Sequence, residues 1–345
     1  MDMEFVVGGA RAWSQILAPY RTPRSSRSVF ELLVTALPFV MLWAAMWAAL
    51  SVGYWLCLLL ALPTACFLMR LFMIQHDCGH GACFKRRATN DWVGRVLGVM
   101  TWTPYGFWLR AHALHHANAG NLERRGHGDI FTMTTDEYFA QTRFQRFVYR
   151  LYRNPLVMFG LIPTYLFVLH YRVPFGLMRA GWRPWLSVMG TNAAIAGVAA
   201  LLVWLMGLGP FLLVQSPVVV LSASIAVWFF YVQHQYEDTL WAHEDDWSFH
   251  EAALKGSSHY ELPPVLAWFT GYIGVHHVHH LCSRIPFYRL PEVLRDHPQL
   301  AALGRLTLLQ SLRCATLALW DETGERLISF RELRPAREAA QSGTS

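Results

Sequence analysis

Two long stretches of this chain carry no Asp, Glu, Lys or Arg, and they dominate its hydrophobic pattern. Residues 32–69 and residues 184–233 are both free of charged side chains. One membrane-spanning helix needs about 20 apolar residues, so each stretch is long enough for two. The turn-forming runs Ser51-Val52-Gly53 and Gly207-Leu208-Gly209-Pro210 lie near their midpoints. The pattern predicts four spans in two hairpins, at about 32–50, 54–75, 184–206 and 210–233.

Two shorter apolar stretches are unlike the spans. Residues 96–109 and 155–169 are too short to cross a bilayer comfortably, and the second contains Pro163. Interfacial or re-entrant helices are therefore expected for both. The expected fold is an all-α integral membrane domain with four transmembrane helices, interfacial helices and a cytoplasmic cap.

Composition supports a membrane protein that has substantial mass outside the bilayer. Hydrophobic residues make up 54% of the chain and charged residues only 15%, and there are 15 Trp. We expect a cytoplasmic segment at residues 1–30, the membrane domain at 31–320 and a tail at 321–345, in which the polar residues 334–345 are disordered. No apolar run follows a basic start in the first 30 residues, so no signal peptide is expected.

The basic residues predict the orientation of the spans. Lys and Arg are frequent in residues 1–30 and 76–183, whereas both predicted hairpin turns are uncharged. The positive-inside rule then places both termini and the middle segment in the cytoplasm. The net charge of +6 has two interpretations: attraction to anionic lipid, or a docking face for an acidic electron-transfer partner. No nucleic acid partner is expected.

Three histidine clusters lie at the edges of the apolar segments. They are His76-Asp77-Cys78-Gly79-His80, His112-Ala113-Leu114-His115-His116 and His276-His277-Val278-His279-His280. Helical residues three and four apart share a face, so each cluster can direct two or three imidazoles at one point. Imidazole binds iron, zinc and copper. So many imidazoles exceed the needs of one ion and predict a dinuclear, oxygen-activating centre at the cytoplasmic membrane surface.

Other residues near these clusters have competing interpretations. His234 ends the fourth predicted span at the same level, although a histidine at a helix end is often only a surface residue or a dipole partner. Asp77 and Glu123 are either carboxylates that orient imidazoles or solvated surface acids. Cys78 and Cys282 lie near the clusters, where packing is favoured over metal binding.

The other cysteines and histidines of the chain limit which residues are expected as metal ligands. No CxxC pair occurs among the six cysteines, so free thiols are expected. His277 falls at the edge of the helical face that HxxHH defines. The histidines without the required spacing are His127, His170, His243, His250, His259, His277 and His297. No ExxH occurs, which argues against a soluble carboxylate-bridged bundle.

The three clusters resemble the signature of the membrane fatty acid desaturases, HxxxH, HxxHH and HxxHH, over roughly residues 30–320. The HDCGH box, the segment Gly120-Asn121-Leu122-Glu123-Arg124 and the run Ile285-Pro286-Phe287-Tyr288 are similar to the omega-6-like acyl-lipid branch. This chain departs from that branch at Ala113-Leu114, where basic residues are common, and at His277, where Val is common.

The resemblance implies a pair of iron ions, O2 as co-substrate and a cis double bond inserted into a lipid acyl chain. It implies nine metal ligands: His76, His80, His112, His115, His116, His234, His276, His279 and His280. No H-P-G-G motif of a fused cytochrome b5 is visible, so a separate electron donor such as ferredoxin or cytochrome b5 is expected. Hydroxylases and ketolases of lipids, alkanes or carotenoids remain an alternative on this scaffold, and a non-catalytic membrane metal-binding protein is a distant one.

Overall fold

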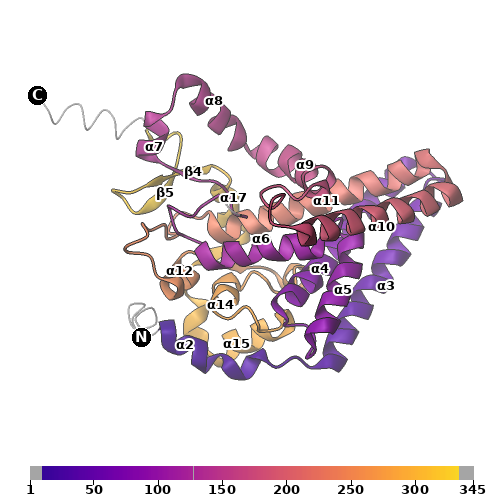
Figure 1. Cartoon of the computed structure of the whole chain (residues 1–345), viewed down its shortest axis with the longest axis horizontal. Coiled ribbons are helices and arrows are strands. Elements are labelled where there is room, and N and C mark those ends of the chain that lie inside the picture. The colour runs from indigo at the N-terminus through magenta and orange to yellow at the C-terminus, as the bar shows by residue number, and fades with distance from the viewer. Residues whose placement is uncertain (1–9, 127, 334–345) are drawn as a thin grey trace, which may run out of the picture.

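Four long apolar helices form the membrane part of the protein. The computed structural model describes residues 10–126 and 128–333, and in them the candidate spans are α3 (Ser25–Ala49), α4 (Tyr54–His80), α10 (Trp182–Met206) and α11 (Leu208–His234). The four predicted spans are thus confirmed. In Figure 1 these helices extend together toward one side, and the strands lie at the other.

The helix ends differ from the predicted bounds in a way that matters for the site. Helix α3 begins at Ser25, seven residues before the charge-free run, so its first two turns include charged and polar residues. Helix α4 continues through Arg70 to His80 and ends at Gly81, whose φ of 67° is the left-handed conformation that terminates helices. The first histidine box is therefore the last turn of a span.

The prediction of one interfacial or re-entrant helix at 96–109 is wrong in its bounds. Helix α5 (Arg87–Met100) stops at a turn, and α6 (Tyr105–Asn118) begins after it. Trp102 in the turn has a φ of 56°, and Pro104 precedes α6, so the backbone cannot continue as one helix. The break lets α6 carry the second histidine box along a new direction.

The other helices are short. They are α2 (Ala10–Ile16), α7 (Thr135–Ala140), α8 (Arg143–Tyr152), α9 (Ile162–Val168), α12 (Phe249–Lys255), α13 (Pro264–Phe269), α14 (His276–Leu281), α15 (Leu290–Asp296), α16 (Pro298–Ala301) and α17 (Leu308–Cys314), with single turns η1 (Ala18–Arg21), η2 (Val157–Leu161), η3 (His170–Arg172) and η4 (Phe287–Arg289). Helix α8 and the segment Val157–Arg172 meet at a bend of 57°. Whether residues 155–169 re-enter the bilayer stays a prediction.

Small β-sheets lie in the part of the molecule outside the spans. Strand β1 (Met133–Thr134) pairs in parallel with β4 (Leu317–Asp321), which pairs antiparallel with β5 (Arg326–Ser329). Strands β2 (His259–Glu261) and β3 (Arg305–Thr307) pair in parallel. Leu327 and Ile328 are buried, so the segment expected as a tail from residue 321 is folded through Leu333. The disorder expected for residues 334–345 lies outside the described residues.

One buried ion pair ties the first two spans to the segment before the third histidine box. The Arg70 guanidinium of α4 is fully buried and donates to Glu31 of α3, and its Nε lies 3.2 Å from Thr35 Oγ1. It also donates to the carbonyl of Trp268, whose ring lies 3.8 Å from the guanidinium carbon.

All six cysteines are free, as expected from the sequence.

Candidate metal centre

The nine candidate ligands come together in two adjacent groups, each with its ligand atoms within 4.8 Å of one another. The first group is His76, His80, His112, His116 and His279, and the second is His115, His234, His276 and His280. The ends of α4 and α11 supply histidines from the spans, and α6 and α14 supply the rest. The structure thus brings together every residue of the predicted site.

The HxxHH spacing divides each box between the two groups. On α6, His112 and His116 are four apart and face the first group, while His115 faces the second. On α14, His276 and His280 face the second group and His279 faces the first. Each short helix therefore supplies ligands to both metal positions.

The Nε2 atoms converge as metal ligands do. In the first group, His112 Nε2 lies 3.0 Å from His80 Nε2 and 3.1 Å from His116 Nε2, which is 3.2 Å from His279 Nε2. In the second, His234 Nε2 lies 3.1 Å from His115 Nε2 and 3.0 Å from His276 Nε2, and His276 Nε2 lies 3.1 Å from that of His280.

These spacings fit metal ions better than hydrogen bonds alone. Metal–imidazole bonds of about 2.0–2.1 Å place neighbouring ligand atoms about 3.0 Å apart in an octahedron and about 3.4 Å apart in a tetrahedron. A neutral imidazole has one N–H and one lone pair, so several mutually contacting Nε2 atoms cannot all be satisfied by one another's protons. A cation between the lone pairs removes this conflict.

Groups around the site set the orientation of some rings. His234 Nδ1 lies 2.9 Å from the carbonyl of Gly256, which holds the proton on Nδ1 and leaves the Nε2 lone pair free. Asp77 Oδ1 lies 3.3 Å from His76 Nδ1, so of the two candidate carboxylates Asp77 does contact a ligand. The side chain of Gln235, the residue after His234, accepts hydrogen bonds from Arg153 and Thr132.

Burial keeps the imidazoles neutral. For the six box histidines outside the spans, burial and then the neighbouring imidazoles hold the pKa well below 6.5: His112, His115, His116, His276, His279 and His280. Neutral imidazole is the form that binds a metal. The second group is wholly buried, whereas His80 and His116 of the first group are partly exposed.

Several candidates lie outside the two groups. His277 Nε2 lies 2.9 Å from the Leu300 carbonyl, and burial lowers its pKa to about 3. Among the described residues, neither metal group contains a cysteine. Cys282 Sγ accepts from Arg21 Nε at 3.0 Å, and Cys78 packs in the core. His127 falls outside the described residues.

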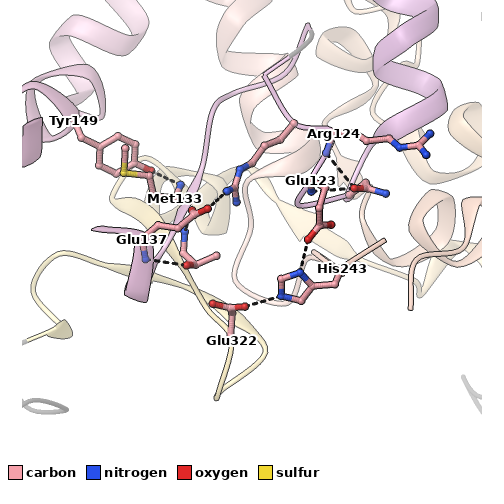
Figure 2. A network of polar contacts seen from close by, with 10 residues as sticks. Glu123, Arg124, Met133, Glu137, Tyr149, His243 and Glu322 are labelled. Atoms are coloured by element: carbon pink, nitrogen blue, oxygen red, sulfur yellow. Dashed lines mark hydrogen bonds and ion pairs between the residues drawn. The ribbon is translucent and has the colours of Figure 1, made fainter. Parts of the chain in front are cut away.

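Glu123 belongs to a surface network rather than to the metal site. Figure 2 shows the His243 ring between two carboxylates, with Nδ1 2.5 Å from Glu123 and Nε2 2.9 Å from Glu322. These hydrogen bonds lower the pKa of Glu123 and raise that of His243. The network joins the loop after the second box to the β4–β5 turn, so Glu123 is the surface acid of the two alternatives.

Sequence reasoning missed Trp108, which packs against the first group. Its ring stacks on His112 at 4.6 Å with an angle of 15° between the planes, and lies 5.8 Å from His76. The signal was present, because Trp108 precedes His112 by one helical turn. A Cβ on Gly79 would come within 3.1 Å of the Trp108 ring, which explains the glycine inside the first box.

The fold and the site define a class: membrane proteins with two histidine-rich metal positions at the ends of their spans. The model of the fatty acid desaturase family matches residues 51–311. The chain is 41% identical over 318 residues to a fatty acid desaturase of Bacillus subtilis, which covers 92% of this chain and 90% of that one. It belongs to the fatty acid desaturase family and is an oxidoreductase.

More distant relatives add acyl-lipid desaturases. An sn-1 acyl-lipid omega-3 desaturase (ferredoxin) of Synechocystis is 29% identical, covering 64% of this chain and 61% of its own length. An sn-1 oleoyl-lipid 12-desaturase of the same organism is 29% identical, covering 70% of both chains. Both omega-3 and 12-desaturases occur among these relatives, so the omega-6-like assignment stays a prediction.

Proposed function

We propose that this chain inserts a cis double bond into an acyl chain of a membrane lipid, using O2 and a pair of iron ions. The observation that carries the proposal is the pair of histidine groups at the ends of two spans, one helical turn from a residue that lines an apolar cavity. The overall reaction takes two hydrogens from the acyl chain, two electrons and two protons, and reduces one O2 to two waters.

The nine histidines are proposed as the iron ligands, five at one position and four at the other. When bound, the iron pair supplies the activation of O2 with two external electrons. The protein's own contribution is to present neutral Nε2 lone pairs and to orient the rings. Gly256 orients His234, and Asp77 orients His76. Burial of the second group excludes bulk water from that position.

An apolar cavity beneath the first group offers a place for the acyl chain. Its empty volume is about 340 Å³ including its open side, and residues of α4, α9, α11 and the α5–α6 turn line it. Phe72, one turn before His76, lines the cavity and packs 5.5 Å from Trp108. Since Trp108 stacks on His112, a chain in the cavity would lead toward the metal groups. Small residues, Ser222, Ala223 and Ala226, border it on α11.

The active site is proposed to face the cytoplasm. The support is the excess of Lys and Arg in residues 1–30 and 76–183 over the uncharged turns. A reporter fused after Ser345 should read cytoplasmic, and one inserted at Gly209 should read external. A cytoplasmic reading at Gly209 would contradict the two-hairpin topology.

A separate protein is proposed to deliver the electrons. The names of three relatives, from Synechocystis, Arabidopsis thaliana and Nostoc, include the word ferredoxin. For this chain, ferredoxin or cytochrome b5 would serve, each carrying one electron at a time.

Expression in a bacterial host with a ferredoxin reducing system tests the proposal. Fatty acids lighter by two hydrogens are expected by mass spectrometry, with the double bond located by derivatisation. The purified protein should contain about two irons per chain, and His80→Ala, His116→Ala and His280→Ala should each abolish activity and leave membrane insertion intact. Products that gain an oxygen would move the protein to the hydroxylases, and metal without any product would favour a binding protein.

A further inference from the structure

A groove lined by arginines opens close to the first histidine group. Its empty volume is about 850 Å³ including the open side, and its walls include Arg24, Arg27, Arg289 and Arg295. Arg24 directly precedes α3, so the groove lies at the membrane surface where that span begins. The second wall comes from η4 and α15, which follow the third histidine box along the chain.

A third basic segment joins this groove. The Ser28 hydroxyl of α3 donates to the carbonyl of Cys83, which brings the loop after the first box against the start of that span. Lys85 and Arg86 follow in the same loop and are exposed. We call the surface formed by these three segments the basic face: Arg24, Arg27, Lys85, Arg86, Arg289 and Arg295.

The basic face carries more positive charge than its own carboxylates neutralise. Arg289 pairs with Glu292, and Arg295 lies 3.4 Å from Asp296. Glu31 is buried and serves both Arg27 and Arg70. In the part of the chain that the structure describes, the side chains of Arg24, Lys85 and Arg86 form no ion pair, which leaves exposed cations for an acidic partner.

A short route connects the groove to a metal ligand. Tyr288 lines the groove, and the backbone N–H of the adjacent Phe287 donates to Asp77 Oδ2 at 2.7 Å. The other carboxylate oxygen of Asp77 lies 3.3 Å from His76 Nδ1. His76 belongs to the first group, which also holds the partly exposed histidines. The first group is therefore the one within reach of a protein seated on the basic face.

We propose that the basic face is the docking surface for an acidic one-electron carrier protein, and that its electrons enter at the first histidine group. The inference rests on the proposed function. Each reduced carrier gives up one electron and leaves oxidised, so two docking events supply the two electrons of one double bond. The two protons come from water, and O2 accepts the electrons as it is reduced to water.

The distribution of charge favours a protein partner over a lipid phosphate. Four of the arginines line one groove, but the basic face continues beyond that groove to Lys85 and Arg86 in the loop after α4, so it is wider than a single phosphate site requires. Complementary charge spread over a surface accelerates the association of two proteins and weakens as salt rises. Arg295 lies on α15, which belongs to the part of the molecule outside the spans.

Charge reversal at exposed positions tests the docking surface. The variant Lys85→Glu/Arg86→Glu/Arg295→Glu is compared with Arg143→Glu/Arg331→Glu, which changes exposed cations on α8 and just after β5. In Figure 1, α8 lies at the top of the view and α15 at the bottom, while β5 lies at the left between these heights. Equilibrium binding of an acidic plant-type ferredoxin in its oxidised form is measured with the protein in nanodiscs of zwitterionic lipid.

The triple variant should bind ferredoxin about tenfold more weakly at low salt, and the difference should shrink at high salt. The control variant should change the Kd less than about twofold. Equal loss in both variants, or no loss in the triple variant, would overturn the docking surface. So would a triple variant whose ferredoxin Kd is unchanged but which loses affinity for vesicles of anionic lipid.

A single-turnover experiment separates this inference from the proposed function. Protein that is reduced chemically and then mixed with O2 needs no carrier. The triple variant should form as much unsaturated product as the unmodified protein under these conditions. No product from either protein would contradict the proposed function, whereas product from both together with unchanged ferredoxin binding would contradict only the docking surface.

Discussion

Filling the apolar cavity at Ala223 should shorten the acyl chain that the enzyme accepts. Ala223 lies on α11, is almost fully buried and borders the cavity beneath the first histidine group. Ala223→Leu adds three carbons to the cavity wall. If the end of the acyl chain occupies this space, the added carbons displace about the same number of methylenes.

The size of the effect follows from the burial of methylenes. Each buried methylene contributes about 0.8 kcal/mol, so three contribute about 2.4 kcal/mol, which corresponds to about 60-fold in kcat/KM for the longest accepted chain. A substrate about three carbons shorter no longer needs the filled space and should keep most of its activity.

The assay is a competition among lipids of graded acyl length, with products resolved by mass spectrometry. The matched control is Ala196→Leu on α10, where the same change faces outward from an exposed position. Metal content and folding of both variants are measured in parallel. An unchanged chain-length preference in folded, metal-loaded Ala223→Leu would refute the assignment of the cavity to the acyl chain.

Further predictions concern the metal site and its support. His234→Ala should lose metal and activity together, because its Nε2 lies within 3.1 Å of two ligand atoms, whereas His277→Ala should keep its metal by mass spectrometry. Glu31→Gln leaves Arg70 unpaired and should cost about 3–5 kcal/mol in bicelle unfolding, while Glu31→Leu/Arg70→Met should cost less; equal costs would contradict the pairing argument. In the unfolded chain, histidines take up protons near their ordinary pKa of 6.5. In the folded protein, burial holds the pKa of the six box histidines outside the spans well below that value, so they do not. Metal-free protein should therefore lose about 1.4 kcal/mol per pH unit for each of them as the pH falls below 6.5, and identical melting curves at about pH 7.5 and pH 5.5 would contradict this.

Features that depend on local sequence were predictable. The charge-free runs at 32–69 and 184–233 predicted the spans because the bilayer requires about 20 consecutive apolar residues. Glycine located the first hairpin turn, and glycine together with proline located the second. The HxxHH spacing predicted histidines on common helical faces because the period of an α-helix is the same in any fold. Even Trp108 lay within reach of that argument, one turn before His112.

The tertiary structure decided what depends on contacts between distant segments. Spacing within a box could not assign His115 and His279 to different groups, because that division arises from where α6 and α14 lie relative to the ends of α4 and α11. The carbonyl of Gly256 reaches His234 from 22 residues away, and the Phe287 amide reaches Asp77 from 210 residues away. Such backbone partners carry no residue-type signal, since every peptide unit offers the same groups.

The basic face shows the same division between sequence and structure. The net charge of +6 was visible in the composition, and two interpretations of it remained open. The basic face combines three segments that are far apart in the chain. The Ser28 hydroxyl donates to the Cys83 carbonyl, and the Arg24 amide donates to the Tyr288 hydroxyl, which brings these segments together. Local periodicity therefore determined the helices and the direction of their histidines, and long-range packing alone determined which charged and polar groups share a surface.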